Sequence, residues 1–436
     1  PVCLGLPGSL PVLNEHAVDL AMRIGAALHC DIKPSTFARK NYFYPDQAKD
    51  YQISQYDQPL NESGWLKLPD GFEVGVTRAH MEEDTGKLTH VGEGGRIHSA
   101  QHALVDYNRS GVPLVEIVSE PDLRSAAQAR AYVAELRGIL MATGASDGRM
   151  EEGSMRVDAN VSVRPAGTST FGTRCEIKNL NSLRSLGRAI EYEAARQVAL
   201  LESGGTVLQE TLHWDEASGR TGSMRSKEEA NDYRYFPEPD LVPLAPDPQW
   251  QARVRATLGP MPADRRAGLV QALGGEASEA ETEQVRVVVD LGLDGLVTAA
   301  VGAGAPIKLA LTRTANEVAA DVERAAGLAP ESFAALVTME AGGKVSATQS
   351  KAVLAALLES GGDPAVIARE MGFEAMGEGA LAPVVAQVVG AHPDEWARYL
   401  EGENKLSGFF VKAVMDATAN KANGKEVIAE LLRLKG

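Results

Sequence analysis

The chain has 436 residues, of which 44% are apolar and 23% charged, and its formal net charge is −16. This length predicts two or three domains, because one domain usually holds ~100–200 residues. No apolar run reaches the ~20 residues of a membrane helix and no basic, then apolar segment opens the chain, so neither a membrane span nor a secretion signal is expected. The negative charge argues against broad, non-specific nucleic-acid binding, but not against local basic patches.

Helix signals recur in the first part of the chain. Asn14, Ser125 and Ser182 each precede apolar residues at helical spacing, and such side chains cap the first amide groups of a helix. Gly144 and Gly204 follow two of these segments and are typical of helix ends. We therefore expect three helices, each beginning directly after one of the capping residues.

Two segments between these helices read as strands. Residues 155–164 alternate between apolar and polar side chains, which predicts a sheet with one buried and one polar face. Residues 112–118 are almost continuously apolar, which predicts a strand buried on both faces. Strands mixed with helices, without a regular strand–helix–strand order, favour an α+β domain with a largely antiparallel sheet.

The composition changes in the segment 237–249, which is rich in proline, as linkers are. The chain is then alanine-rich and helical in period to its end, and residues 360–364 (S-G-G-D-P) mark a second boundary. These signals predict three domains. They are a mixed domain at 1–245, an all-α helical domain at 246–360 and a helical tail domain at 361–436.

Two common catalytic devices are missing from the sequence. The nearest match to a phosphate-binding loop, residues 342–345 (G-G-K-V), lacks the upstream glycine and the hydroxyl residue and reads as a turn between helices. Cys30 and Cys175 lie in patterns of buried small residues, which argues against a cysteine nucleophile. With Cys3 they are too few for a disulfide framework, so a reducing, cytoplasmic location is expected.

Carboxylates stand in unusual places. Glu116 lies in an apolar strand and shares its face with Leu114 and Val118, where an ionised carboxylate is costly unless a cation or hydrogen bonds compensate. Carboxylates from different strands that meet on one sheet face make a hard-oxygen site suited to Mg²⁺. A plainer interpretation is that Glu116 pairs with an arginine and that the acidic run at 82–84 is solvated. The other members are Glu82, Glu83 and Asp84 in one run, and Glu151, Glu152 and Asp158 in another.

Two segments combine basic and aromatic residues, 39–46 (R-K-N-Y-F-Y-P-D) and 232–240 (D-Y-R-Y-F-P-E-P-D). Such side chains suit phosphate contact together with base stacking, worth ~1–3 kcal/mol per base. Tyr42, Tyr44 and Arg234 are therefore candidates for RNA contact. An equally good interpretation is that the aromatic rings belong to the core and the basic residues to the surface.

Taken together, eight segments resemble the signature blocks of the B subunits of the tRNA-dependent amidotransferases. They follow one another in order, and the helical remainder is similar in layout with weaker motifs. They are P-V-C-L-G-L-P-G-S-L-P-V-L-N (1–14), R-K-N-Y-F-Y-P-D (39–46), Y-Q-I-S-Q-Y-D-Q-P (51–59), H-M-E-E-D-T-G-K (80–87), N-R-S-G-V-P-L-V-E-I-V-S-E-P-D (108–122), M-E-E-G-S-M-R-V-D-A-N-V-S-V-R-P (150–165), E-I-K-N-L-N-S (176–182) and D-Y-R-Y-F-P-E-P-D (232–240).

The resemblance implies a cradle domain related in fold to glutamine synthetase and guanidino kinases, then a helical domain and a helical tail. It implies a heterotrimer, in which an amidase-type A subunit frees ammonia from glutamine and a small C subunit holds the other two together. The B subunit would use ATP to phosphorylate the side-chain carboxylate of Glu on tRNA(Gln) or Asp on tRNA(Asn), and ammonia would displace the phosphate. This agrees with the missing cysteine nucleophile.

The resemblance also implies roles for single residues. Glu83 and Glu116 match the family's Mg²⁺ ligands, whereas a third ligand, a histidine in an E-V-H strand, would precede Pro1. Cys3 matches the end of a C-P-x-C zinc knuckle, so a structural Zn²⁺ site would be incomplete. We therefore expect some tens of residues ahead of Pro1. Candidates for binding ATP phosphates are Lys40, Arg78 and Lys178, and further candidates near the nucleotide are Glu82, Glu152 and Asp158.

The tail carries four lysines that the resemblance assigns to contact with the outer corner of the tRNA, although a solvated helical face fits their charge equally well. They are Lys405, Lys412, Lys421 and Lys425. Two rival functions remain, a non-catalytic tRNA-binding scaffold and a free-standing ligase that acts on a small amino acid. A scaffold would show no magnesium-dependent ATP cleavage stimulated by misacylated tRNA, and a free-standing ligase would need neither tRNA nor partners.

Overall fold

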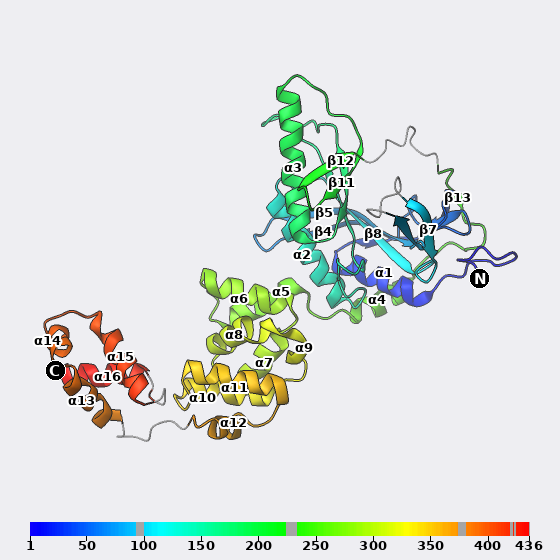
Figure 1. Cartoon of the computed structure of the whole chain (residues 1–436). Helices are drawn as coiled ribbons and strands as arrows, with labels where there is room; N and C mark the ends of the chain where they lie inside the picture. The colour runs from blue at the N-terminus through cyan, green and yellow to red at the C-terminus, as the bar shows by residue number, and fades with distance from the viewer. Residues whose placement is uncertain (93–99, 224–232, 374–380, 419–421, 423, 436) are drawn as a thin grey trace. The chain divides into compact units, whose positions relative to one another are not determined.

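The computed structural model describes residues 1–92, 100–223, 233–373, 381–418, 422 and 424–435. The chain forms two compact units, Pro1–Pro262 and Ala263–Gly436. Figure 1 shows the first unit as sheets with helices and the second as helices alone. Within the described residues, no helix is both long and apolar enough to cross a membrane.

The three predicted helices of the first unit are confirmed. They are α1 (Glu15–Ala27), α2 (Ala126–Ala142) and α3 (Leu183–Glu202). The side chains of Asn14, Ser125 and Ser182 each accept a hydrogen bond from an amide in the first turn, which satisfies a donor that the helix itself leaves unpaired. Gly144 and Gly204 follow the helix ends with φ of 71° and 81°, which glycine adopts without strain.

The main sheet of the first unit has seven described strands in the order β1-β4-β5-β3-β2-β13, with β8 paired to β5, and every pair is antiparallel. The largely antiparallel sheet is therefore confirmed. The strands are β1 (Asp31–Ile32), β2 (Ala38–Asn41), β3 (Tyr51–Ser54), β4 (Asn61–Lys67), β5 (Glu73–Glu83), β8 (Pro113–Ser119) and β13 (Phe236–Pro237).

A second sheet has the order β12-β11-β10-β9, in which only β10 and β11 run parallel. Helices α2 and α3 pack with both sheets around one core, which includes Val74, Leu136 and Ile177 (Figure 1). The strands are β9 (Val157–Val161), β10 (Cys175–Leu180), β11 (Thr211–Asp215) and β12 (Arg220–Ser223), and β6 (Lys87–Gly92) pairs separately with β7 (Ala100–Asp106). The alternation predicted for 155–164 is confirmed over the shorter β9.

Strand β8 differs from the prediction for 112–118. None of its side chains is fully buried, and Glu116 is half exposed. Val115 and Ile117 pack against the cores on one face, while Leu114 and Val118 share the other face with Glu116. The continuous apolar run overstated burial because only one face of this strand meets the core.

Strand β5 changes its buried face halfway along. Val74 and Val76 are buried, and further on Ala79 and Met81 are buried, so the alternation shifts by one residue. The register with β8 shifts between Val76 and Arg78, which is a β-bulge. A bulge re-aims the side chains that follow it. Arg78, His80 and Glu82 consequently lie on the face opposite to the buried alanine and methionine.

The proline-rich segment 237–249 is not a free linker. It contains part of β13, and Leu244 forms two backbone hydrogen bonds of 2.8 Å with Ser35. Helix α4 (Pro248–Ala256) follows and packs on α1, where Trp250 Nε1 donates to Asp19 Oδ1 at 2.6 Å. These contacts carry the first unit to Pro262, beyond the boundary expected at residue 245.

The second unit is helical, and its described residues form two hydrophobic cores, one built from residues between Leu269 and Phe373 and one between Leu381 and Leu431. Ala368 in α12, which follows the predicted boundary at residue 360, belongs to the first core. The helices are α5 (Pro262–Ala272), α6 (Glu279–Asp290), α7 (Asp294–Gly302), α8 (Ile307–Asn316), η1 (Val318–Ala320), α9 (Val322–Ala325), α10 (Pro330–Ala341), α11 (Ala347–Ser360), α12 (Pro364–Glu370), α13 (Leu381–Ala391), α14 (Pro393–Leu400), α15 (Leu406–Ala417) and α16 (Gly424–Lys435).

Candidate active site

A histidine and two carboxylates meet on the polar face of the main sheet. His80 on β5 lies directly opposite Glu116 on β8, and Glu82 follows His80 by two residues on the same face. His80 Nε2 is 3.3 Å from Glu82 Oε1 and 3.3 Å from Glu116 Oε2. One ligand atom from each of the three lies within 4.8 Å of the others. We refer to His80, Glu82 and Glu116 as the acidic triad.

The Glu82 carboxylate is fixed by two side chains of the neighbouring strand β3. Ser54 Oγ donates to Oε1 at 3.0 Å, and Gln52 Nε2 donates to Oε2 at 3.2 Å. Burial on its own would raise the pKa of Glu82, but the hydrogen bond and charge of His80, the charge of Lys40 and the Ser54 hydroxyl outweigh it, so the pKa is lowered. Glu82 therefore remains an anion at neutral pH although its side chain is only 10% exposed.

The structure separates Glu83 from the triad. Glu83 follows Met81 on the core-facing side of β5, where its carboxylate forms an ion pair with Lys49 and accepts a hydrogen bond of 2.9 Å from the Ile53 amide. The resemblance implied that Glu83 and Glu116 lie together, but among the described residues it is Glu82 that lies beside Glu116.

The structure bears on the plainer interpretations of these carboxylates. Among the described residues, the ion-pair partner of Glu116 is His80, and no described arginine pairs with it. In the acidic run the side chains of Glu82, Glu83 and Asp84 are 10%, 15% and 12% exposed, so the run is not solvated. Asp84 pairs with Arg156 at 2.9 Å and Arg109 at 3.3 Å, which ties the end of β5 to the start of the second sheet.

Two cations flank the triad. The Lys40 ammonium lies 4.9 Å from the centre of the Tyr233 ring, and the Arg78 guanidinium lies 4.6 Å from the centre of the Tyr56 ring. Within the described part of the chain neither forms an ion pair with a carboxylate, and Arg78 Nε is buried without a hydrogen-bond partner there. Both cations can therefore bind an anionic ligand beside the triad.

The remaining nucleotide candidates form ion pairs with residues outside the triad. Lys178 on β10 is 3.6 Å from both Asp158 and Glu176, and these ion pairs lie on the polar face of the second sheet. Burial lowers the pKa of Lys178, but the two carboxylates outweigh it and raise the pKa. Glu152 pairs with Arg149 at 2.9 Å in an exposed turn.

The RNA candidates of the first unit have different surroundings. Tyr42 follows β2 and is half buried, and burial raises its pKa, with smaller contributions from Asp46 and Glu83. Tyr44 is 46% exposed. Arg234 is exposed and has φ of 45°, in the left-handed region.

Cys3 is half buried beside Ser110, whose hydroxyl donates to the Cys3 carbonyl oxygen at 3.5 Å. In the described ranges it belongs to no group of three ligand-bearing side chains.

In the tail, Lys405 and Lys412 are exposed at the start and middle of α15, and Lys425 lies at the start of α16. Lys421 lies outside the described residues.

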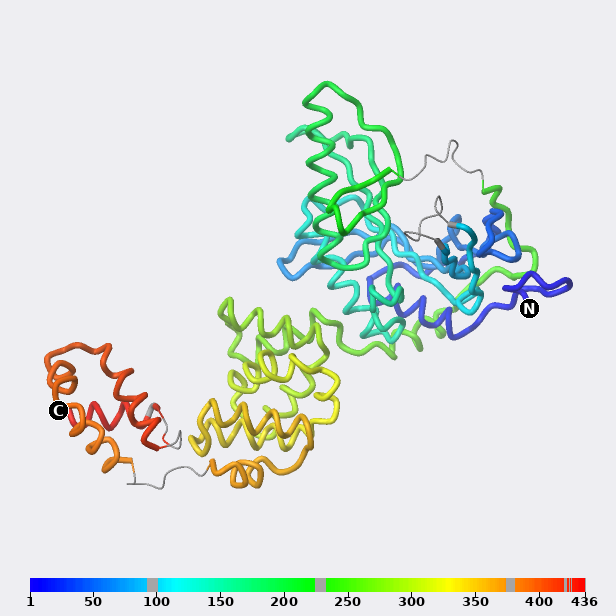
Figure 2. Tube along the Cα trace, viewed as in Figure 1, coloured from blue at the N-terminus to red at the C-terminus, as the bar shows by residue number. Residues whose placement is uncertain are grey.

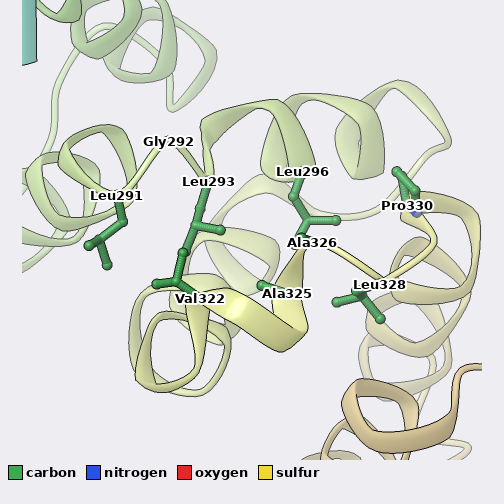
Figure 3. A pocket seen from close by; sticks show the side chains of 9 residues that line it. All are labelled: Leu291, Gly292, Leu293, Leu296, Val322, Ala325, Ala326, Leu328 and Pro330. Carbon is green, nitrogen blue, oxygen red and sulfur yellow. The ribbon is translucent and has the colours of Figure 1, made fainter. Parts of the chain in front are cut away.

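The second unit contains a cavity of ≈ 270 Å³ beside α7 and α9. Its lining side chains are apolar (Figure 3), so it offers no acid, base or metal ligand and is no rival to the triad as a catalytic site. They are Leu291, Gly292, Leu293, Leu296, Val322, Ala325, Ala326, Leu328 and Pro330.

The sequence interpretation missed three residues of this site, His80, Tyr56 and Tyr235. His80 could have been found, because His80 and Glu82 are two residues apart in a strand and so share a face. Tyr235 stacks on Tyr56 with 5.5 Å between ring centroids, and Tyr56 meets the His80 ring edge-on at 6.2 Å. No local signal in the sequence brings residues 56 and 235 together.

The donor set of the triad fits a divalent cation. Neighbouring ligands around an octahedral Mg²⁺ are ~3 Å apart, because each lies at 2.0–2.1 Å from the ion. The two 3.3 Å separations from His80 Nε2 are close to this value. Two carboxylates are hard ligands that suit Mg²⁺, and the single imidazole also suits Mn²⁺ or Zn²⁺.

A sheet face that combines this triad with two cations that have no carboxylate partner among the described residues is typical of a catalytic domain. The chain belongs to the GatB/GatE family, because residues 1–252 match the GatB/GatE catalytic domain and residues 296–434 match the GatB domain. It is 48% identical over 454 residues to the B subunit of the aspartyl/glutamyl-tRNA(Asn/Gln) amidotransferase of Frankia casuarinae, covering 100% of this chain and 89% of the relative. The proteins of the same name from Gloeobacter violaceus and Carboxydothermus hydrogenoformans are 46% and 45% identical, with 100% of this chain covered in both and 80% and 91% of the relatives.

Proposed function

We propose that this chain is the ATP-using subunit of a tRNA-dependent amidotransferase. It phosphorylates the side-chain carboxylate of Glu on tRNA(Gln) or Asp on tRNA(Asn), and ammonia then converts the acyl phosphate to the amide. The observation that carries this proposal is the acidic triad with Lys40 and Arg78 beside it. Family membership supports it, as do the relatives named as B subunits of aspartyl/glutamyl-tRNA(Asn/Gln) amidotransferases.

The roles follow from charge and position. Glu82, Glu116 and His80 would hold Mg²⁺, which when bound neutralises charge on the phosphate oxygens of ATP. Lys40 and Arg78 bind the same oxygens from the two sides of the triad and orient the γ-phosphoryl group. Ser54 and Gln52 keep the Glu82 carboxylate in place without charging the site.

The substrate supplies the reacting atoms. A carboxylate oxygen of the aminoacyl side chain attacks the γ-phosphorus, and ADP leaves. Ammonia then attacks the acyl carbon, and inorganic phosphate leaves with the bonding electrons. We propose that an amidase-type A subunit releases this ammonia from glutamine and that a small C subunit makes up the heterotrimer, because the described Cys30 and Cys175 are buried and burial raises the pKa of both thiols.

The test is ATP cleavage by the reconstituted heterotrimer. We expect cleavage to require Mg²⁺ and to be stimulated by Glu-tRNA(Gln), Asp-tRNA(Asn) or both, measured as released phosphate together with amidated tRNA. Uncharged tRNA is the control, since it offers no carboxylate to phosphorylate. Cleavage that ignores the aminoacyl group, or amidation without ATP, would show that the chain is a scaffold or a ligase of another kind.

We also propose a fold relationship for the first unit and a cellular location for the protein. The antiparallel main sheet with one polar, cation-lined face supports a cradle related to glutamine synthetase and guanidino kinases. We place the protein in the cytoplasm, where aminoacyl-tRNA is made and where its free cysteines stay reduced. A structural Zn²⁺ at Cys3 would need ligands from other segments, because Cys30 and Cys175 belong to hydrophobic cores.

The helical tail would contact the tRNA through exposed lysines of α15. Replacing Lys405 and Lys412 together by Gln should raise the KM for misacylated tRNA about tenfold and leave kcat unchanged, because each lysine releases counterions when it meets a phosphate. The measurement is steady-state amidation at two salt concentrations, between which the KM of the variant should also change less than that of the wild type. The surface control is a double variant in which Arg398, on α14, and Glu403, just after α14, are both replaced by Gln. These two side chains pair with each other at 2.9 Å, so their joint replacement leaves the net charge unchanged.

A further inference from the structure

A segment from the end of the first unit returns to the active site. We call residues 233–244 the strap; Figure 2 shows it in green beside the blue strands of the main sheet. The Asn41 amide donates to the Tyr233 carbonyl oxygen at 2.9 Å, and Asn41 Nδ2 donates to the Arg234 carbonyl oxygen at 2.8 Å. Phe236 then pairs with Arg39 in β2. The strap therefore forms the edge of the sheet next to Lys40.

A buried ion pair locks the strap to β2. Arg39 Nε donates to Glu238 Oε2 at 2.7 Å and Nη2 donates to Oε1 at 2.8 Å, a bidentate pair, and Nη2 also reaches Asp240 Oδ2 at 3.2 Å. The Glu238 side chain is fully buried. Burial would raise the pKa of Glu238, but the Arg39 hydrogen bonds outweigh it and lower the pKa. The pair is a strong, directional contact between segments far apart in the sequence.

The strap carries two tyrosines into a row with Tyr56. Tyr233 meets Tyr235 edge-on at 6.2 Å, and Tyr235 stacks on Tyr56 at 5.5 Å and 22°. We call these three residues the tyrosine row. Lys40 lies over the Tyr233 end and Arg78 over the Tyr56 end, so the row joins the two cations that flank the triad.

We propose that the strap is part of the catalytic site, a proposal that rests on the function given above. The tyrosine row restricts the rotamers of Lys40 and Arg78 and holds both cations ready for phosphate oxygens, so less entropy is lost when ATP binds. Glu238 acts through Arg39 by fixing the strap. Tyr56, Tyr233, Tyr235 and Glu238 are therefore positioning residues for nucleotide binding.

If the tyrosine row positions the two cations, ATP binding depends on the ring of Tyr235 and not on its hydroxyl group. In the reconstituted heterotrimer, Tyr235→Leu should raise the KM for ATP about tenfold, the cost of one poorly held cation contact, with a smaller effect on kcat. Tyr235→Phe should stay within about twofold of the wild type, because it keeps the stack on Tyr56. Equal losses in both variants would assign the effect to the hydroxyl and overturn the proposal.

Glu238→Gln should also raise the KM for ATP about tenfold, while the KM for misacylated tRNA stays unchanged. The matched control is Glu340→Gln, which weakens a similarly buried bidentate arginine pair in the second unit and should lower the melting temperature without changing the KM for ATP. If Glu238→Gln changes only the melting temperature, or raises the KM for tRNA instead, the strap does not position the cations. Tyr235→Leu decides the matter if Glu238→Gln does not fold.

The wild-type protein separates the two proposals. If the wild-type heterotrimer shows no Mg²⁺-dependent ATP cleavage, the proposed function itself is wrong. If the wild type turns over normally and the KM for ATP is unchanged in both Tyr235→Leu and Glu238→Gln, only the role of the strap is wrong.

Discussion

Glu82→Gln is expected to lower the kcat of ATP-dependent amidation by about 10²–10³-fold, the usual cost of removing one group that stabilises charge in a transition state. The change keeps the shape of the side chain and, with the amide oxygen at the Oε1 position, the hydrogen bond from Ser54. It puts an NH2 group where Oε2 accepts from Gln52 and removes the negative charge that faces His80 and Glu116. Hydrolysis of glutamine by the partner amidase should continue. The measurement is single-turnover formation of amidated tRNA at saturating ATP.

The neighbouring residue supplies the control for this prediction. Glu83→Gln makes the same chemical change one residue further on, at the opposite face of β5, where it weakens the ion pair with Lys49. It should lower the free energy of unfolding by about 1–3 kcal/mol, because a buried ammonium keeps a weaker partner. Its kcat should stay within a few-fold of the wild type. The opposite result, a silent Glu82→Gln and an inactive Glu83→Gln, would move the metal site to the other face of the sheet.

Arg313→Met is expected to destabilise the second unit by about 3–5 kcal/mol. Arg313 is 6% exposed and joins α8 to α10 through Glu340, with Nε donating to Oε2 at 2.8 Å, and it also pairs with Glu317 at 3.3 Å. Its removal leaves the Glu340 carboxylate, 9% exposed, without its cation. Hydrogen–deuterium exchange of peptides from α8 and α10 in the full chain measures the loss.

The double variant Arg313→Met with Glu340→Leu tests the reason given for this loss. Removing both charges from the helix contact leaves no buried ion without a partner, so most of the stability should return. If the double variant exchanges as fast as the single one, the arginine contributes through packing of its chain rather than through charge.

The sequence predicted those features of the fold that depend on neighbouring residues. Asn14, Ser125 and Ser182 cap their helices through hydrogen bonds to amides three residues further on, so the local pattern was sufficient. The alternation in β9 was readable for the same reason. By contrast, the apolar run around Glu116 did not show which face of β8 meets the core, because that depends on residues distant in the sequence.

The candidate site depended on two features that the sequence does not display. The register shift between Val76 and Arg78 decides which of two adjacent glutamates, Glu82 or Glu83, faces Glu116. A pattern with a period of two cannot reveal such a shift, because the extra residue is visible only against the partner strand. The stack of Tyr235 on Tyr56 likewise requires the strap to return to the sheet.

The ion pair between Arg39 and Glu238 joins residues that are 199 positions apart in the chain. During synthesis, β2 emerges long before its edge partner exists, so the nucleotide pocket stays unfinished until nearly the whole first unit has left the ribosome. Closing so large a loop is slow, and its entropy cost is offset only when the final contacts form. Newly made protein would therefore acquire its affinity for ATP as a last, all-or-none event, which delays nucleotide consumption until the catalytic unit is complete.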